Sequence, residues 1–359
     1  MSARVEHLQE KLRHKDVDAL LVMQPENRRY LSGFTGTAGA LVVARQNIYF
    51  LADFRYFEQA KQECPGWEIR EIKDSTFDSV VDYLPEWKIL RLGYEDNFLT
   101  HKQFKELEDR LQAIMLVPLA GVVEELRQTK EEAEVEIIKK AAELADQAFQ
   151  HVVDFIRPGV TEREIALEVE FFMRRRGARK ASFEFIVASG PRGAMPHGVA
   201  SNKTLQEGEL VTLDYGCEYE GYCSDFTRTV SLGSPAARQE QIYRIVLEAQ
   251  KAGLASIRAG VKACEVDEAV RRVIGDYNYS ENFRHSSGHG VGLTVHEGPQ
   301  LSKKDETILK AGMVLTVEPG IYLPGWGGVR IEDMVLLEEE GFRLLTRAPR
   351  DYLVTCGVV

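Results

Sequence analysis

The sequence lacks the features that mark several common classes of protein. No apolar run approaches the roughly 18 residues of a membrane-spanning helix, so we expect no membrane partner. No stripe of lysine and arginine is present and the net charge is −11, so we expect no nucleic-acid partner. The first residues are charged and carry no apolar secretory segment, and we therefore expect a cytoplasmic protein.

Cysteine is scarce and follows no pattern. The five cysteines are odd in number and include no CxxC motif. A disulfide framework and a thiolate zinc site are therefore not indicated, and reduced thiols are the expected state.

The chain is long enough for two domains of different character. Its 359 residues are 44% hydrophobic and 28% charged, which is ordinary for a soluble globular protein. Residues 1–125 alternate between helix and strand patterns, which predicts an α/β domain with a mostly parallel sheet. A charged, periodic stretch from Glu124 to Ile156 predicts one long amphipathic helix at the start of a second domain, residues 126–359.

The second domain has an order of elements that occurs twice. A helix is predicted from residue 162, capped by Thr161 and Glu164, and strands follow it. A second pair of helices, at about 236–256 and 265–275, again precedes strands. This order indicates an α+β domain with an internal duplication.

Two aspartates lie in a predicted β-hairpin, "GELVTLDYGCEYEGYCSDFTRTVSL". A turn centred between Tyr219 and Glu220 would place Asp214 directly opposite Asp225, with Cβ atoms about 4.5–5.5 Å apart. Like charges in that arrangement destabilise a sheet unless a cation lies between them. The alternative is a pair of exposed strand aspartates, but aspartate is rare in strands and both residues lie inside apolar runs.

Further candidates lie near the C-terminus. Glu318 ends an apolar strand before Pro-Gly, and the strand period places Arg330 and Glu332 on one face. The Gly-rich loop "HSSGHGVGLTVHEGP" holds three histidines but matches neither GxGxxG nor GxSxG. One imidazole with four carboxylates would form a mostly oxygen site suited to Mn²⁺ or a similar ion, and two ions would balance its charge better than one.

Four motifs carry a family resemblance: "LDYGCEYEGYCSDFTRT", "GHGVGLTVHEGP", "VLTVEPGIY" and "GGVRIEDMVL". Together they resemble the creatinase-like metallopeptidases of the pita-bread fold, and within them the Xaa-Pro peptidases, aminopeptidase P and prolidase. The N-terminal stretches "SGFTGTAG" and "DFRYFEQA" extend this resemblance over the whole chain. It implies an α/β N-terminal domain followed by an α+β pita-bread catalytic domain with a pseudo-twofold duplication.

The resemblance also assigns roles to individual residues. It implies two divalent metal ions, with Mn favoured over Co or Zn, and these ligands: Asp214, Asp225, His289, Glu318 and Glu332. Asp225 and Glu332 match the bridging positions, and Glu318 is also the expected proton carrier. The residues expected to position substrate and stabilise the transition state are His197, His285 and His296. Arg330 matches a further catalytic-site residue, an arginine that lies behind the metal ligands.

The implied reaction is hydrolysis of the Xaa-Pro bond at the free N-terminus of proline-containing peptides or dipeptides. Two alternatives remain: a methionine aminopeptidase-type activity, and a non-catalytic binding protein on the same fold. The second is disfavoured because all five ligand positions are occupied by suitable residues. The resemblance further implies a homodimer, in which Phe34 and Arg55 would help to close the other subunit's cleft.

Overall fold

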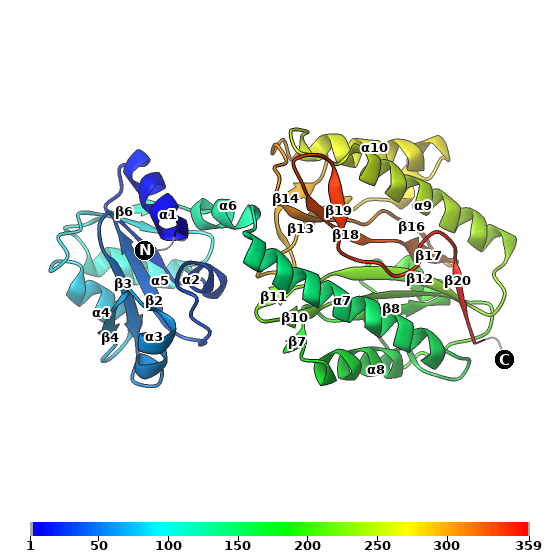
Figure 1. The fold of residues 1–359 in the computed structure, drawn as a ribbon, viewed down its shortest axis with the longest axis horizontal. Helices are drawn as coiled ribbons and strands as arrows, with labels where there is room; N and C mark the ends of the chain where they lie inside the picture. The colour runs from blue at the N-terminus through cyan, green and yellow to red at the C-terminus, as the bar shows by residue number, and fades with distance from the viewer. Residues whose placement is uncertain (1–2, 358–359) are drawn as a thin grey trace. The chain divides into compact units, whose positions relative to one another are not determined.

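The computed structural model describes residues 3–357, and the chain divides between Arg127 and Gln128 into two compact units (Figure 1). Within residues 3–357, no helix is long and apolar enough to cross a membrane.

The N-terminal unit is built on one six-stranded sheet in the order β4-β3-β2-β1-β5-β6. Its strands are β1 Ala19–Val22, β2 Ala40–Ala44, β3 Ile48–Ala52, β4 Glu68–Glu71, β5 Arg91–Tyr94 and β6 Met115–Pro118. Its helices are α1 Ala3–His14, α2 Pro25–Ser32, α3 Phe57–Glu63, α4 Thr76–Tyr83, α5 His101–Arg110 and α6 Val122–Gln128. The α/β prediction is confirmed. The sheet is mixed, because β2 is antiparallel to both of its neighbours while the other pairings are parallel.

The ring of Phe34 belongs to the core of this unit. It is 1% exposed and packs edge-on against Phe50 and Tyr56, with ring centroids 4.7 and 5.8 Å away. The expectation that Phe34 helps to close another subunit's cleft is therefore wrong, because the ring fills its own domain. Arg55 is exposed and pairs with Asp53 at 2.7 Å.

The single long helix predicted from Glu124 is two helices, α6 and α7 Glu132–Phe155. Between them, Thr129 forms an antiparallel bridge with Met313, and the Lys130 amide donates to the Gly312 carbonyl at 2.8 Å. The Glu131 amide then donates to Glu134 Oε2 at 2.9 Å, which caps the new helix. The sequence keeps its helical periodicity across this break. The helix is interrupted by contacts with residues far along the chain, and the local sequence pattern does not show them.

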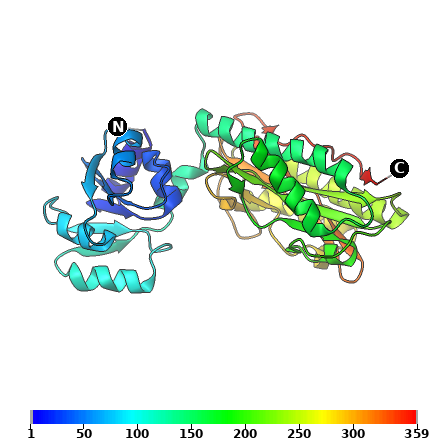
Figure 2. The same cartoon turned by 90° about the horizontal axis from the view of Figure 1, so that it is seen from below.

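The C-terminal unit repeats the order of helix pair and strands. Helices α7 and α8 Glu162–Arg175 share one core with the first strands, and α9 Ala237–Ser256 and α10 Ala263–Asp276 share another with the later ones. In Figures 1 and 2 each helix pair lies together on the outside of the strands. The predicted duplication and the Thr161–Glu164 capping box are both confirmed.

Within residues 128–357, the strands form four sheets. Their orders are β20-β12-β9-β8, β14-β13-β15-β18-β19, β11-β10-β7 and β16-β17. The bounds in the first half are β7 Lys180–Ala181, β8 Ile186–Ser189, β9 Leu210–Tyr215, β10 Cys217–Tyr219, β11 Tyr222–Cys223 and β12 Phe226–Leu232. Those in the second half are β13 Gly288–Gly290, β14 Glu297–Leu301, β15 Val314–Val317, β16 Gly320–Leu323, β17 Gly327–Arg330, β18 Asp333–Leu337, β19 Phe342–Leu344 and β20 Val354–Cys356. The described residues of this unit also form two 3₁₀ helices, η1 Gly190–Ala194 and η2 Ser280–Asn282.

The aspartate hairpin has a different register from the one predicted. Tyr219 pairs with Tyr222, so the turn is Glu220-Gly221, and both residues have positive φ, 46° and 86°. A two-residue turn with both φ angles positive matches the twist of the strands. Asp214 therefore lies opposite Thr227, and Asp225 is its diagonal neighbour. The direct opposition predicted for the two aspartates is wrong, but a shift of two residues keeps both on one face.

We predict that Phe34→Ala destabilises the N-terminal unit by about 3–5 kcal/mol, because it leaves a cavity in a packed core. The matched control is Leu90→Ala, since Leu90 is 67% exposed and its replacement should change the free energy of unfolding by less than about 0.5 kcal/mol. Denaturant unfolding followed by circular dichroism measures both. Equal stability of the two variants would contradict the packing described for Phe34.

Candidate metal centre

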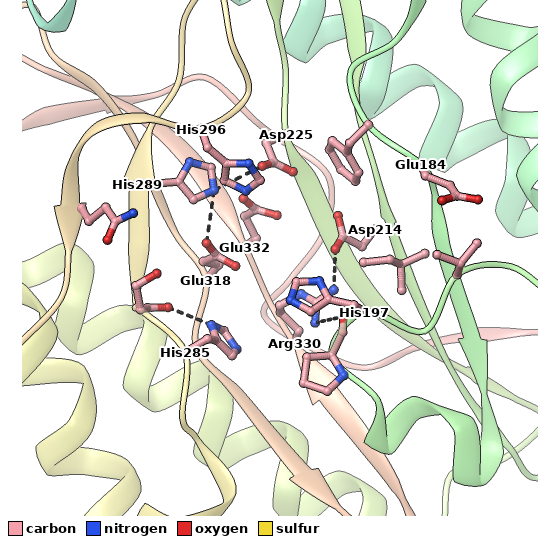
Figure 3. A pocket seen from close by; sticks show the side chains of 16 residues that line it. Glu184, His197, Asp214, Asp225, His285, His289, His296, Glu318, Arg330 and Glu332 are labelled. Atoms are coloured by element: carbon pink, nitrogen blue, oxygen red, sulfur yellow. Dashed lines mark hydrogen bonds and ion pairs between the residues drawn. The ribbon is translucent and has the colours of Figure 1, made fainter. Parts of the chain in front are cut away.

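The nine predicted site residues converge on one cavity of about 440 Å³ in the C-terminal unit. They come from separate stretches of the chain and are Asp214, Asp225, His289, Glu318, Glu332, His197, His285, His296 and Arg330. Figure 3 shows the carboxylates and the His289 ring directed toward one another from opposite walls.

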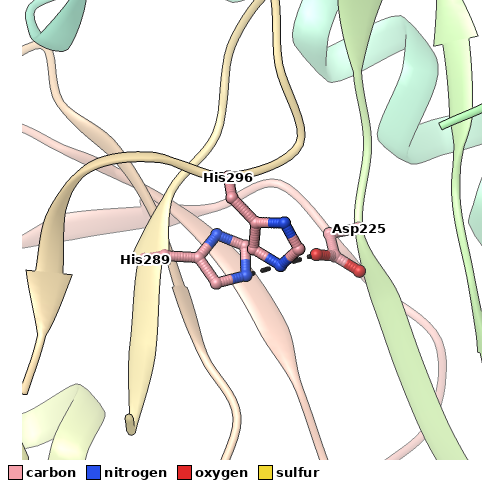
Figure 4. A group of neighbouring side chains, drawn as sticks. All are labelled: Asp225, His289 and His296. Carbon is pink, nitrogen blue, oxygen red and sulfur yellow. Dashed lines mark ion pairs between the residues drawn. The ribbon is translucent and has the colours of Figure 1, made fainter. Parts of the chain in front are cut away.

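The side chains fall into overlapping groups whose ligand atoms all lie within 4.8 Å of one another. One group is Asp214, Asp225 and Glu332, and a second is His289, Glu318 and Glu332. Glu332 belongs to both. A third group joins Asp225 to His289 and His296, so Asp225 is shared as well (Figure 4).

His289 is held where only glycine can flank it. A Cβ atom on Gly288 would lie 2.0 Å from the Thr316 carbonyl oxygen, and one on Gly290 would lie 2.4 Å from that of Gly298. The backbone of β13 therefore lies closer to the neighbouring backbone than a side chain at either glycine position would allow. The His289 ring donates from Nδ1 to the Gly290 carbonyl at 3.0 Å, which leaves Nε2 3.4 Å from Asp225 Oδ2 and 3.3 Å from Glu318 Oε1.

Three of the buried carboxylates have raised pKa values. Burial raises the pKa of Asp214 to about 6, although Arg330 opposes the change. Burial likewise raises the pKa of Glu318 to about 7, against the opposing effect of His289. The pKa of Glu332 is raised well above its usual value by burial and by the negative charges of Asp225 and Glu318. Without a compensating positive charge, these groups resist ionisation.

Two buried oxygens identify where that charge belongs. Asp214 Oδ1 and Glu332 Oε1 are buried and have no hydrogen-bond partner among residues 3–357. A buried oxygen without a hydrogen-bond partner reduces the stability of the fold by about 1–3 kcal/mol, and by more when the group is charged. A divalent cation between the carboxylates would satisfy both atoms, and the oxygen-rich donor set with one imidazole fits such an ion.

Arg330 compensates part of the negative charge and is itself 4% exposed. Its Nη2 group donates to Asp214 Oδ2, and its Nη1 group donates to the Tyr322 hydroxyl at 2.7 Å and the Pro196 carbonyl at 3.3 Å. The prediction that Arg330 and Glu332 share a face agrees with their joint presence in the cavity wall.

The three other histidines of the cavity differ in burial and in hydrogen bonding. Burial and the nearby charge of Arg330 lower the pKa of His285 to about 3, so its ring is neutral. Its Nδ1 donates to the Ser286 carbonyl at 2.8 Å, and its Nε2 accepts from the Tyr322 hydroxyl at 2.9 Å. His197 and His296 are exposed on the cavity wall, and the His296 ring lies 4.3 Å from that of His289.

Several residues at the site were missed in the sequence. Tyr322 links Arg330 to His285, and Thr227 donates to Glu332 Oε2 at 2.8 Å. The pairing of Gly320 with Arg330 places Tyr322 on the face of Arg330, so correct pairing of β16 with β17 would have indicated it. The remaining unpredicted side chains of the wall include Phe183, Glu184, Ile186, Val199 and Gln300.

A buried ion pair supports the backbone between β17 and β18, where Glu332 lies. Arg228 is 1% exposed and donates from Nη1 to the carbonyls of Thr227 and Glu332. Its Nη2 donates to Asp333 Oδ1 at 2.8 Å, and Gln250 donates to the other oxygen of Asp333 at 2.6 Å. Asp333 follows Glu332 directly, so this network holds the backbone at the shared ligand and at the next residue.

Comparison with known proteins agrees with this geometry. Residues 136–339 match the model of metallopeptidase family M24, and residues 4–129 match the creatinase/prolidase N-terminal domain. The chain is 39% identical over 355 residues to the Xaa-Pro dipeptidase of Pyrococcus furiosus, covering 98% of this chain and 100% of that one.

Solved structures show the same similarity. An Xaa-Pro dipeptidase from Bacillus anthracis superimposes with a TM-score of 0.96 at 44% identity, over 98% of this chain and 99% of that one. The prolidase of Pyrococcus horikoshii gives 0.92 at 39% identity, over 98% and 100%. The predicted resemblance to creatinase-like peptidases, with its fold class, is confirmed, and so is the prediction of a metallopeptidase. The chain belongs to metallopeptidase family M24 and carries the creatinase/prolidase N-terminal domain.

Proposed function

We propose that this protein is a metallo-exopeptidase that hydrolyses the Xaa-Pro bond at the free N-terminus of peptides or dipeptides. The observation that carries the proposal is the pair of overlapping ligand groups that share Glu332 in the wall of a peptide-sized cavity. Relatives similar over nearly the full length are named Xaa-Pro dipeptidase, which supports the choice of substrate.

We infer that the site holds two divalent ions, with Mn²⁺ favoured over Co²⁺ or Zn²⁺ because oxygen donors predominate. Asp214 and the shared carboxylates of Asp225 and Glu332 would hold one ion, and the shared carboxylates with His289 and Glu318 the other. When bound, such ions lower the pKa of water and polarise the scissile carbonyl group.

The chain's own residues would orient the peptide and handle its charges. His296 faces the cavity beside His289 and Asp225, where a neutral imidazole N–H can donate to the carbonyl oxygen of the scissile bond. Glu318 lines the cavity beside His289 and Glu332, where its carboxylate would be placed to carry a proton to the leaving nitrogen. His197 and Arg330 would position the substrate, with His285 holding Tyr322 in place.

The other candidate activities are less well supported. The match over residues 4–129 favours an Xaa-Pro peptidase over a methionine aminopeptidase of the simple type, which lacks that domain. A non-catalytic binding protein would not need five ligand residues brought to one cavity.

We also propose that the protein is a homodimer. Phe54 lies next to Arg55 in the loop before α3 and is 80% exposed. Aromatic residues are enriched in protein–protein interfaces. Light scattering at assay concentration tests this, and a fully active monomer would exclude it.

We predict that the protein hydrolyses Xaa-Pro dipeptides or Xaa-Pro-Xaa peptides and leaves Met-Xaa peptides without proline intact. Chelation should abolish turnover while circular dichroism stays unchanged, because each unit has its own hydrophobic core and does not need a metal to fold. Adding Mn²⁺ back should restore activity. Preferential cleavage of Met-Xaa peptides would contradict the proposed specificity.

We predict that Asp225→Ala removes both ions and abolishes activity, because the Asp225 carboxylate is shared between ligand groups. The control is Glu339→Ala, which removes an exposed carboxylate of the turn after β18 and should keep full metal content. Elemental analysis of the purified proteins gives the metal stoichiometry. Two tightly held ions in Asp225→Ala would show that this residue is not a shared ligand.

We predict that His296→Ala retains its metal ions but loses about 10²- to 10³-fold in kcat, the usual effect of removing a hydrogen-bond donor to a developing oxyanion. His7→Ala, which changes an exposed histidine of α1, should behave like the unaltered protein. Steady-state kinetics and metal analysis are measured on the same samples. Loss of metal from His296→Ala would instead make His296 a ligand.

A further inference from the structure

A second buried carboxylate lies outside the metal centre and takes no part in the proposed reaction. Glu162 is the first residue of α8 and its side chain is 0% exposed. A negative charge at a helix N-terminus is favourable, but full burial of glutamate is rare unless the charge is paired. The surroundings of Glu162 show what this buried charge holds in place.

The Glu162 carboxylate joins the two ends of the segment 189–201. Its Oε1 atom accepts from the amide and hydroxyl of Ser189, at 2.8 and 2.9 Å. Its Oε2 atom accepts from the amide and hydroxyl of Ser201, at 3.1 and 2.6 Å. Arg192 Nε donates to the same Oε2 atom at 2.9 Å and supplies the compensating positive charge.

The segment closed in this way forms one wall of the cavity. Pro196, His197 and Val199 all line it. Arg192 reaches across the segment and donates from Nη2 to the Val199 carbonyl at 2.6 Å. At the tip, Arg330 donates to the Pro196 carbonyl at 3.3 Å. The wall is therefore fastened at its tip by a residue of the metal centre and at its base by the pair Glu162 and Arg192.

We propose that Glu162 and Arg192 act as a positioning pair that holds His197 and Val199 at the distance from the metal centre that a bound peptide requires. A buried ion pair adds little net stability compared with apolar residues of the same size, so the contribution of this pair lies in the geometry that it defines. Neither residue of the pair is among the side chains that line the cavity. The substrate in this proposal rests on the proposed Xaa-Pro peptidase function.

Replacing the charged Glu162 with a neutral residue should make the segment 189–201 more mobile. Glu162→Gln keeps the shape of the side chain, but one of its oxygens becomes an NH₂ group that faces donors from Ser189 or Ser201. We expect KM for an Xaa-Pro peptide to rise roughly 10- to 100-fold, the range that small misplacements of a binding group produce, with kcat reduced less and metal content unchanged. Arg192→Ala should have the same effect, and the double variant should be no worse than either single one.

Hydrogen exchange measured by mass spectrometry on the metal-loaded protein tests the pair directly. Faster exchange in Glu162→Gln should be confined to peptides spanning 189–201. The matched control is Glu164→Gln, because Glu164 lies on the same helical turn but bonds only to Thr161 in the capping box, and neither exchange in 189–201 nor KM should change.

A lower melting temperature for Glu162→Gln and Arg192→Ala with unchanged KM and unchanged exchange in 189–201 would overturn the proposal, since the pair would then be structural only. If the unaltered protein does not cleave Xaa-Pro peptides, the proposed function fails by itself. The exchange of segment 189–201 still decides whether Glu162 and Arg192 hold this wall.

Discussion

The repulsion among carboxylates buried in one cavity is the constraint on which the rest of this structure depends. Asp214, Asp225, Glu318 and Glu332 bring their oxygens together out of water, where several of their pKa values are raised. Such an arrangement is unstable without positive charge. Arg330 neutralises one oxygen of Asp214, and the unpartnered oxygens point to cations for the remainder.

The surrounding structure keeps the carboxylates from moving apart. The buried pair of Arg228 and Asp333 holds the backbone around Glu332, and the glycines beside His289 let its strand lie against its neighbours. On the facing wall, Glu162 closes the segment that carries His197. Each of these three features fixes the position of the backbone as well as of side chains. The site therefore keeps one geometry although its residues come from separated stretches of the chain.

The sequence was informative where chemistry is local. Hydrophobic periodicity predicted most helices and strands, and the aspartates and glutamates inside apolar strands indicated the candidate ligands. Long-range contacts were not predictable in the same way. The register of the Asp214 hairpin depended on a turn one residue further along, and the burial of Phe34 depended on a partner strand. The contacts of Glu162 could not be inferred, because an acidic residue is common in the first turn of a helix and its partners Ser189 and Ser201 lie far along the chain.

The most direct test of the central claim is a crystal structure of the Mn²⁺-loaded protein with anomalous diffraction recorded near the manganese edge. We expect two anomalous peaks in the cavity about 3.5–4 Å apart, with the Glu332 carboxylate contacting both ions and Asp214 Oδ1 contacting one. A single peak, or two ions bound without Glu332 between them, would contradict the claim that shared carboxylates organise this site.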